Sequence, residues 1–181
     1  MKRILIGGIG NVLMGDDGIG PYVARLIESR YEFPDHVNVV DLGTPGLDLV
    51  VHLSRYDTAI LVDAVDNGQL AGSLTLYCKA DIVRHGPPVR MDPHSPALAE
   101  TLLLGDFSGE GPKEVALIGV TGQSYEFDTG LSSPVQASVE AIVTAVIAEL
   151  AKLGVQPIPR TTPQSSGIWW QQDAIALTAA R

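Results

Sequence analysis

The sequence contains little cysteine, little positive charge and no long apolar run. Cys78 is the only cysteine among 181 residues, which excludes a disulfide framework and a cysteine metal cluster and favours a reducing cytoplasm. Lys and Arg total 12 against 21 Asp and Glu, a formal net charge of -9. This balance argues against nucleic acid or an anionic membrane as the main partner. No apolar stretch approaches the ~20 residues of a membrane helix, and the first run is too short for a signal peptide.

What the sequence does contain is typical of one globular α/β domain. Hydrophobic residues make up 45% and charged residues 18%, a composition that supports a folded core. Apolar runs predict five strands, and helical periodicity separates several of them, which favours a mostly parallel sheet covered on both faces. The runs begin at Ile4, Val37, Thr58, Gly72 and Glu114. Cys78 lies in one of them, and we expect it in the core.

A glycine-rich loop, residues 7–20, follows the first strand and contains two adjacent carboxylates, Asp16 and Asp17. The loop is not a dinucleotide fingerprint, because Leu13 stands at the third glycine position. It is not a phosphate-binding loop either, because Asp16 stands where a lysine is needed. Asp17 is interpretable as the N-cap of the next helix, with Pro21 in its first turn. Capping explains one aspartate, but neither the second one nor the glycines.

The end of the chain divides into a clear helix and an irregular tail. Ser133 is expected to cap a helix that has Pro134 at its first position and ends at Gly154. We divide the chain into a domain over residues 1–156 and a C-terminal tail over 157–181. Three prolines, Thr and Ser pairs and the Trp169-Trp170 pair leave two possibilities open for the tail. It is either a flexible linker or a short docking helix.

Acidic residues and one histidine collect where strands are expected to end. In a parallel sheet, ligands bind beyond the carboxyl ends of the strands. The residues at these ends are Asp16, Asp17, Asp41, Asp63, Asp66 and, in a later loop, His94. Two carboxylates and an imidazole make a site for a divalent metal. Alternatively, backbone N–H groups satisfy Asp63 and His94 is an exposed loop residue. The common zinc-protease and serine-hydrolase motifs are absent.

Ordered motifs make the chain resemble the nickel–iron hydrogenase maturation endopeptidases. The match covers roughly residues 3–155 and excludes the tail after about Pro159. Its motifs are the run from Gly8 to Gly20, then Asp41-Leu42-Gly43-Thr44-Pro45-Gly46, Val62-Asp63-Ala64, Pro93-His94, and Gly130-Leu131-Ser132 leading into Pro134-Val135. The chain departs from the family in lacking a proline near Thr121, in having an extra serine before Pro134, and in having Ala97 where glycine is common. These departures affect substrate-facing loops.

The resemblance implies a fold, an activity and a site. The fold is a three-layer sandwich with a twisted five-stranded sheet. The activity is removal of a C-terminal peptide from the precursor of the hydrogenase large subunit, with nickel in that substrate as the recognition element. The metal-contacting and catalytic residues fall on Asp17, Asp63 and His94, with Asp16 as a neighbouring acid. A monomer is expected. Two alternatives are a non-catalytic nickel-binding checkpoint protein and a general metallopeptidase.

Overall fold

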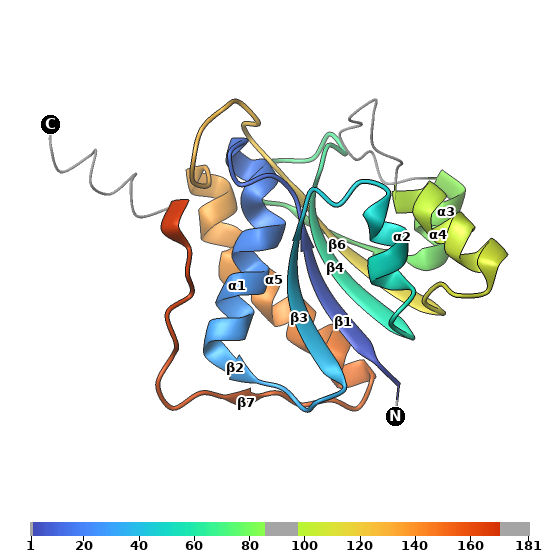
Figure 1. The fold of residues 1–181 in the computed structure, drawn as a ribbon. Helices are drawn as coiled ribbons and strands as arrows, with labels where there is room; N and C mark the ends of the chain where they lie inside the picture. Colours follow the sequence, from blue (N-terminus) through green and yellow to red (C-terminus); the bar gives the residue numbers. More distant parts are fainter. Residues whose placement is uncertain (1, 86–97, 171–181) are drawn as a thin grey trace, which may run out of the picture.

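The computed structural model describes residues 2–85 and 98–170 and shows a three-layer α/β fold (Figure 1). The main sheet has five strands in the order β3-β1-β4-β6-β5. Four of them are parallel, and β5 runs antiparallel to β6 at the edge. The mostly parallel five-stranded sheet predicted from the sequence is therefore confirmed. The strands are β1 (Ile4–Ile9), β3 (Val37–Gly43), β4 (Thr58–Val65), β5 (Leu74–Cys78) and β6 (Glu114–Thr121).

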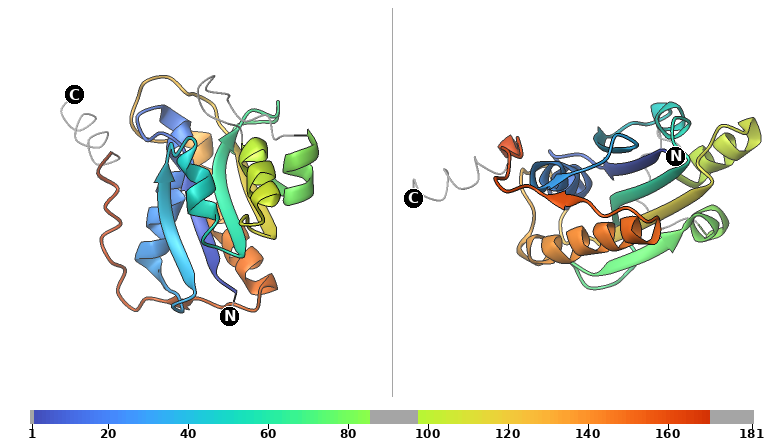
Figure 2. Two further views of the ribbon diagram at one scale, coloured as in Figure 1. Left: turned by 45° about the vertical axis from the view of Figure 1, so that its right-hand side comes forward. Right: turned by 90° about the horizontal axis from the view of Figure 1, so that it is seen from below.

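Helices cover both faces of this sheet, as two views of the ribbon show (Figure 2). One face carries α1 (Ile19–Arg30) and α5 (Ser133–Lys152), which contact each other and the central strands. The opposite face carries three shorter helices, α2 (Asp48–Leu53), α3 (Lys79–His85) and α4 (Leu98–Ser108). Each face has its own cluster of buried apolar side chains. The layers therefore enclose two cores, with the sheet between them.

Strand β4 shows how the sequence determines this layering. All eight of its residues are buried, and its side chains alternate between the two cores. Ile60 and Val62 pack with α1 and α5, whereas Ala59 and Leu61 pack with the helices of the other face. Helix α5 is long and apolar enough to cross a membrane by composition alone. Its apolar stripe, however, is the surface that it buries against the sheet.

Two local predictions are wrong, and one helix was not predicted. Cys78 is exposed, because it ends the edge strand β5, which β6 pairs on one side. The N-cap of α5 is Ser132 rather than Ser133, so Pro134 is the second helical residue. Residues 79–85 form helix α3, which was not predicted from the sequence. Helix α3 contains a single buried side chain, Ile82, so it has little of the apolar periodicity from which helices are predicted.

The C-terminal segment up to Trp170 packs along the domain. Strand β7 (Ile158–Pro159) pairs antiparallel with β2 (Tyr31–Glu32). Further on, Ile168 and Trp170 are buried and belong to the same apolar cluster as α1 and α5. The described part of this segment runs alongside α1 (Figure 1). The division of the chain at residue 156 stays a prediction.

Candidate functional site

The candidate site lies at the carboxyl ends of β1 and β4, where the topology reverses. From β1 the chain crosses through α1 to β3 on one side, and then through α2 to β4 on the other. The direction of the connections therefore reverses at β1, and the carboxyl ends of β1 and β4 flank a topological switch point, where ligands bind in sheets of this kind. Asp17 follows β1, and Asp63 lies near the end of β4. The fold thus brings together two of the three predicted site residues.

The glycines of the first loop let the start of α1 approach the strand ends closely. A Cβ atom on Gly20 would lie 2.1 Å from the Ile9 carbonyl oxygen and 2.5 Å from that of Val62. A Cβ on Gly10 would lie 1.8 Å from the carbonyl oxygen of Asp17, and Gly10 also has a φ of 138°, which favours glycine. The glycine cluster that capping left unexplained therefore positions the acidic turn against the sheet.

Asp17 lies in a 3-10 turn, η1 (Gly15–Gly18), directly before α1. Its Oδ2 accepts a hydrogen bond of 2.8 Å from the backbone N–H of Asn11. The N-cap of α1 is Gly18, so the interpretation of Asp17 as the cap is wrong. The Asp17 side chain is half-buried and is oriented by the preceding loop. It is therefore fixed in place and still accessible.

Asp63 is a buried carboxylate, 5% exposed. Its Oδ1 accepts a hydrogen bond of 2.8 Å from the Ala64 N–H. Burial raises its pKa well above the usual range, and the negative charge of Asp17 raises that pKa further. The hydrogen bond from one backbone N–H group therefore does not compensate for the burial of Asp63. This result argues against the alternative that backbone N–H groups satisfy its carboxylate. Two repelling carboxylates at a strand end form a site that a bound cation would stabilise.

His94 lies outside the described residues, so the trio as a whole stays a prediction. Within residues 2–85 and 98–170, no group of three or more His, Cys, Asp or Glu side chains is arranged to hold a metal ion. The described part of the site consists of Asp17 and Asp63. In the sequence, His94 comes four residues before Leu98, which packs in the core on the α2 and α4 face.

Asp16 binds the site to a distant loop, a role that sequence reasoning did not assign. It is 1% exposed, and its carboxylate accepts four hydrogen bonds from the loop after β6. The donors are the backbone N–H groups of Gln123, Ser124 and Ser132 and the Ser132 hydroxyl, at 2.7 to 3.0 Å. This loop arches over the acidic turn (Figure 1). The two adjacent aspartates therefore have different roles. Asp16 holds the loop after β6, whereas Asp17 lies close enough to Asp63 to raise its pKa.

Polar side chains beyond the ends of β4 and β6 form a second network that sequence reasoning missed. Asn67 accepts a hydrogen bond of 2.8 Å from the Thr121 hydroxyl and donates to Thr75 and Tyr77. The Tyr125 hydroxyl donates to the Val65 carbonyl oxygen at 3.1 Å. Burial raises the pKa of Tyr125, and nearby aspartates raise it further. The signal was weak, because Asn67 and Tyr125, which connect the network, lie in irregular loops.

The remaining aspartates that the sequence grouped with the site have other roles. Asp41 at the end of β3 accepts a hydrogen bond from the Arg25 Nε at 3.2 Å and another from the Gly43 N–H. Asp66 is exposed just beyond β4. Neither residue shares the burial of Asp63. Of the acids named from the sequence, the structure therefore favours Asp17 and Asp63 as the pair that meets a ligand.

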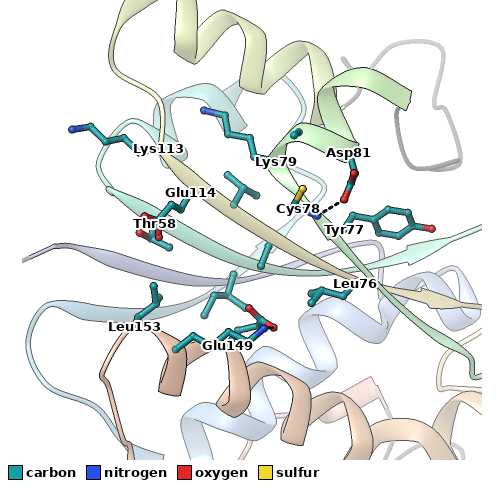
Figure 3. Close-up of a pocket in the computed structure, with 15 residues that line it drawn as sticks. Thr58, Leu76, Tyr77, Cys78, Lys79, Asp81, Lys113, Glu114, Glu149 and Leu153 are labelled. Carbon is teal, nitrogen blue, oxygen red and sulfur yellow. Dashed lines mark hydrogen bonds and ion pairs between the residues drawn. The ribbon is translucent and has the colours of Figure 1, made fainter.

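A large pocket at the opposite end of the sheet provides a contrast (Figure 3). Its volume is about 610 Å³. It is lined by Thr58 and Glu114, the first residues of β4 and β6, and by Cys78, the last residue of antiparallel β5. It therefore lies at the amino ends of the parallel strands, away from Asp63. None of the predicted site residues lines it.

Comparison with known proteins identifies close relatives along most of the chain. A sequence model described as hydrogenase maturation protease (HycI) matches residues 21–149. The Hydrogenase 2 maturation protease of Escherichia coli strain K12 is 35% identical over 158 residues, which cover 87% of this chain and 96% of that protein. The Hydrogenase expression/formation protein HupM of Azotobacter chroococcum mcd 1 is 39% identical, over 87% of this chain and 76% of its own length.

Solved structures agree. The hydrogenase maturating endopeptidase HybD from E. coli superimposes with a TM-score of 0.78 at 34% identity, covering 88% of this chain and 98% of that one. A [NiFe] hydrogenase maturation protease HycI from Thermococcus kodakarensis KOD1 gives a TM-score of 0.64 at 26% identity, covering 83% of this chain and 93% of its own. The similarity thus extends over nearly all of HybD.

Proposed function

The chain belongs to the hydrogenase maturation protease family and is an endopeptidase, and on that premise we propose how its site recognises the substrate. The substrate is the precursor of a [NiFe] hydrogenase large subunit, from which a C-terminal peptide is removed after nickel has been inserted. Asp17, Asp63 and His94 contact the nickel that the precursor carries. The enzyme acts as a cytoplasmic monomer that docks the precursor transiently.

The observation that carries this proposal is the burial of the Asp63 carboxyl group beside Asp17. Burial and a like charge both oppose ionisation of Asp63, so the pair is electrostatically incomplete without a cation. A precursor that arrives with its metal supplies that cation. The site then distinguishes loaded from unloaded precursor, because an unloaded precursor leaves the two carboxylates repelling each other. Binding of the metal-loaded precursor therefore also removes the repulsion between the two carboxylates.

His94 completes the donor set in this proposal. Imidazole suits nickel as a ligand, and a neutral histidine adds a third donor without adding negative charge. The described part of α4 begins at Leu98, on the same face of the sheet as Leu61. Asp63 follows Leu61 by two residues in β4, so strand alternation directs it to that face. The sequence position of His94 therefore suits an approach to Asp63 from this side.

Cleavage then follows from proximity. Docking through the metal places the scissile peptide beside the site and removes the entropic cost of an encounter. A metal ion at this position supplies Lewis acidity toward a carbonyl oxygen or a water molecule. Asp17 is half-buried, whereas Asp63 is buried, so Asp17 is the carboxylate that water reaches. We assign Asp17 as the general base that accepts the proton of the attacking water.

A processing assay tests the proposal. The large-subunit precursor from the same source is prepared with and without nickel, the protein is added, and the intact mass of the precursor is measured. We expect loss of a C-terminal peptide only from the nickel-loaded form. Equal cleavage of both forms, or cleavage of unrelated peptides, would indicate a general metallopeptidase. An unchanged mass in both forms, with every candidate subunit, would indicate a checkpoint protein that binds without cutting.

A further inference from the structure

A second pocket adjoins the active site and is walled by the C-terminal segment of the chain. It has a volume of about 290 Å³ and opens beyond the carboxyl ends of β1 and β3. This volume lies near the lower end of the range for ligand pockets, which suits a side chain or a short peptide. The lining residues come from the first loop, from the end of β3 and from the C-terminal segment, and the last group comprises Gly167, Trp169 and Trp170.

This pocket is separated from Asp17 by a single strip of backbone. Asn11 lines the pocket, and its N–H group donates the hydrogen bond that orients Asp17. Gly10 lines it too, and the carbonyl oxygen of Asp17 occupies the place that a Gly10 side chain would take. A peptide whose scissile bond lies at Asp17 therefore passes next to this pocket.

The wall formed by the C-terminal segment is fixed by contacts along its length. Arg160 and Gln164 donate backbone hydrogen bonds to the carbonyl oxygens of Arg30 and Ser29, at 2.8 and 3.0 Å. The Trp170 side chain is buried in the core. Trp169 is 57% exposed, and its ring meets that of Trp170 edge-on, with centroids 5.7 Å apart. The fold thus holds an exposed indole at the rim of the pocket.

The lining favours an uncharged occupant that has both polar and apolar groups. Arg25 and Asp41 both line the pocket, but they pair with each other at 3.2 Å, so neither demands an opposite charge from a ligand. Asn11 and Thr44 supply polar groups, and Val12 and the indoles supply apolar contact area. Exposed tryptophans at well-formed pockets commonly contribute much of the binding energy of an interface. The chemistry therefore matches an uncharged side chain that packs against an indole.

We infer that this pocket binds an uncharged side chain of the precursor beside the scissile peptide, and that Trp169 is a specificity-determining residue. The inference rests on the proposed function, because it takes the precursor as the peptide at the site. Trp169 then contributes to binding of the precursor and not to the chemistry at Asp17 and Asp63. Its loss changes KM and leaves kcat unaltered.

Steady-state processing of the nickel-loaded precursor tests this assignment. We expect Trp169→Ala to raise KM about tenfold, the cost of losing an aromatic anchor, at unchanged kcat. Trp169→Phe keeps an aromatic ring and should retain most of the affinity. Leu103→Ala removes a half-exposed apolar side chain on α4 and should leave KM unchanged. A folded Trp169→Ala protein with the KM of the unmodified chain would overturn the inference.

Fluorescence separates failure of this inference from failure of the proposed function. The chain has two tryptophans, so Trp170→Phe leaves Trp169 as the single indole reporter. Addition of the precursor should shift its emission whether or not cleavage follows. No shift in a protein that binds the precursor would overturn the inference, even if the unmodified chain cuts normally. A shift that depends on enzyme concentration without precursor would also overturn it, by indicating a second copy of the chain in the pocket.

Discussion

The two ends of the central sheet differ in what they bury. At the amino ends of the strands the pocket is the larger one, but charged residues that line it form ion pairs, Lys152 with Glu149 and Glu114 with Lys2 outside the pocket. At the carboxyl ends Asp16 and Asp63 are almost completely buried, and backbone groups approach within the space that a side chain would need. Buried charge is costly to fold, so its presence marks the functional end better than pocket size does.

The largest effect is expected from the residues that meet the substrate. Asp17→Asn, Asp63→Ala and His94→Ala should each lower the rate of precursor processing by about 10³-fold, near the upper range for loss of an acid–base group or a charge stabiliser. Asp48→Asn changes an exposed carboxylate in the first turn of α2 and serves as the control. Initial rates of peptide release from the nickel-loaded precursor provide the measurement. Normal processing by a folded His94→Ala protein contradicts the assignment.

A smaller but structural effect is expected at the glycine contact between α1 and the sheet. Gly20→Ala would place a Cβ 2.1 Å from a backbone carbonyl oxygen, and backbone cannot move aside cheaply. We expect a loss of about 3 kcal/mol in unfolding free energy, at the upper end of overpacking costs. Gly130→Ala is the control, with a φ of 97° but open space around it, and should cost about 1–2 kcal/mol. Urea unfolding monitored by circular dichroism compares them.

Asp16→Ala should destabilise the protein and disorganise the loop after β6. The change leaves three backbone N–H groups and one hydroxyl without their acceptor. We expect a cost of about 2–3 kcal/mol in unfolding free energy, since those donors are partly buried. Asp128→Ala, in the same loop, removes an exposed carboxylate that accepts from Thr129 and should cost less than about 0.5 kcal/mol. Equal losses of unfolding free energy in the two variants would contradict the role of Asp16 in holding this loop.

These residues show which parts of the molecule could be predicted from the sequence. The strands could, because runs such as that of β4 are apolar on both faces and have few alternative structures. The proximity of Asp17 to Asp63 could also be predicted, because parallel strands bring their carboxyl ends to one edge of the sheet. The hydrogen bonds between Asp16 and the loop after β6 could not be predicted, because the partners of Asp16 lie 107 to 116 residues away in an irregular loop.

The C-terminal segment was equally unpredictable. Its proline-rich composition has no period that indicates packing. Only the tertiary structure shows that Pro159 pairs with Tyr31 and that Trp170 is buried. The wrong N-cap has a related cause, because Ser132 is held by Asp16, and so α5 begins one residue earlier than local capping rules indicate. In each case a long-range contact decided between local alternatives.

The pH dependence of stability sharpens the contrast between the two ends. In the metal-free protein the pKa of Asp63 is raised by folding, so the folded state holds its proton to a higher pH than the unfolded state does. Asp63 therefore destabilises the fold increasingly as pH rises above the unfolded pKa of about 4 and through the folded pKa. Asp63→Asn removes this penalty. The stability advantage of the variant over the unmodified chain should be larger at about pH 8 than at about pH 5, by chemical denaturation with a chelator present.

The smallest effects are expected at the amino-end pocket. Glu114→Gln and Lys113→Ala change exposed residues that line it, and surface charges of this kind contribute little to stability. Processing rates should stay within about twofold of the unmodified chain, and unfolding free energies within about 0.5 kcal/mol. A tenfold loss of processing in either variant would indicate that the substrate contacts the amino ends of the strands and would contradict binding at the carboxyl ends.

Hydrogen exchange, with and without excess nickel-loaded precursor, most directly tests whether substrate binds at the carboxyl ends. Backbone protection reports which end the precursor covers. We expect slower exchange in residues 10–17, in residues 63–67 and in the loop after β6, with no change in residues 76–81 or 113–116. Protection confined to the amino-end pocket, with unchanged exchange around Asp17 and Asp63, would contradict binding of the precursor at the carboxyl ends of the strands.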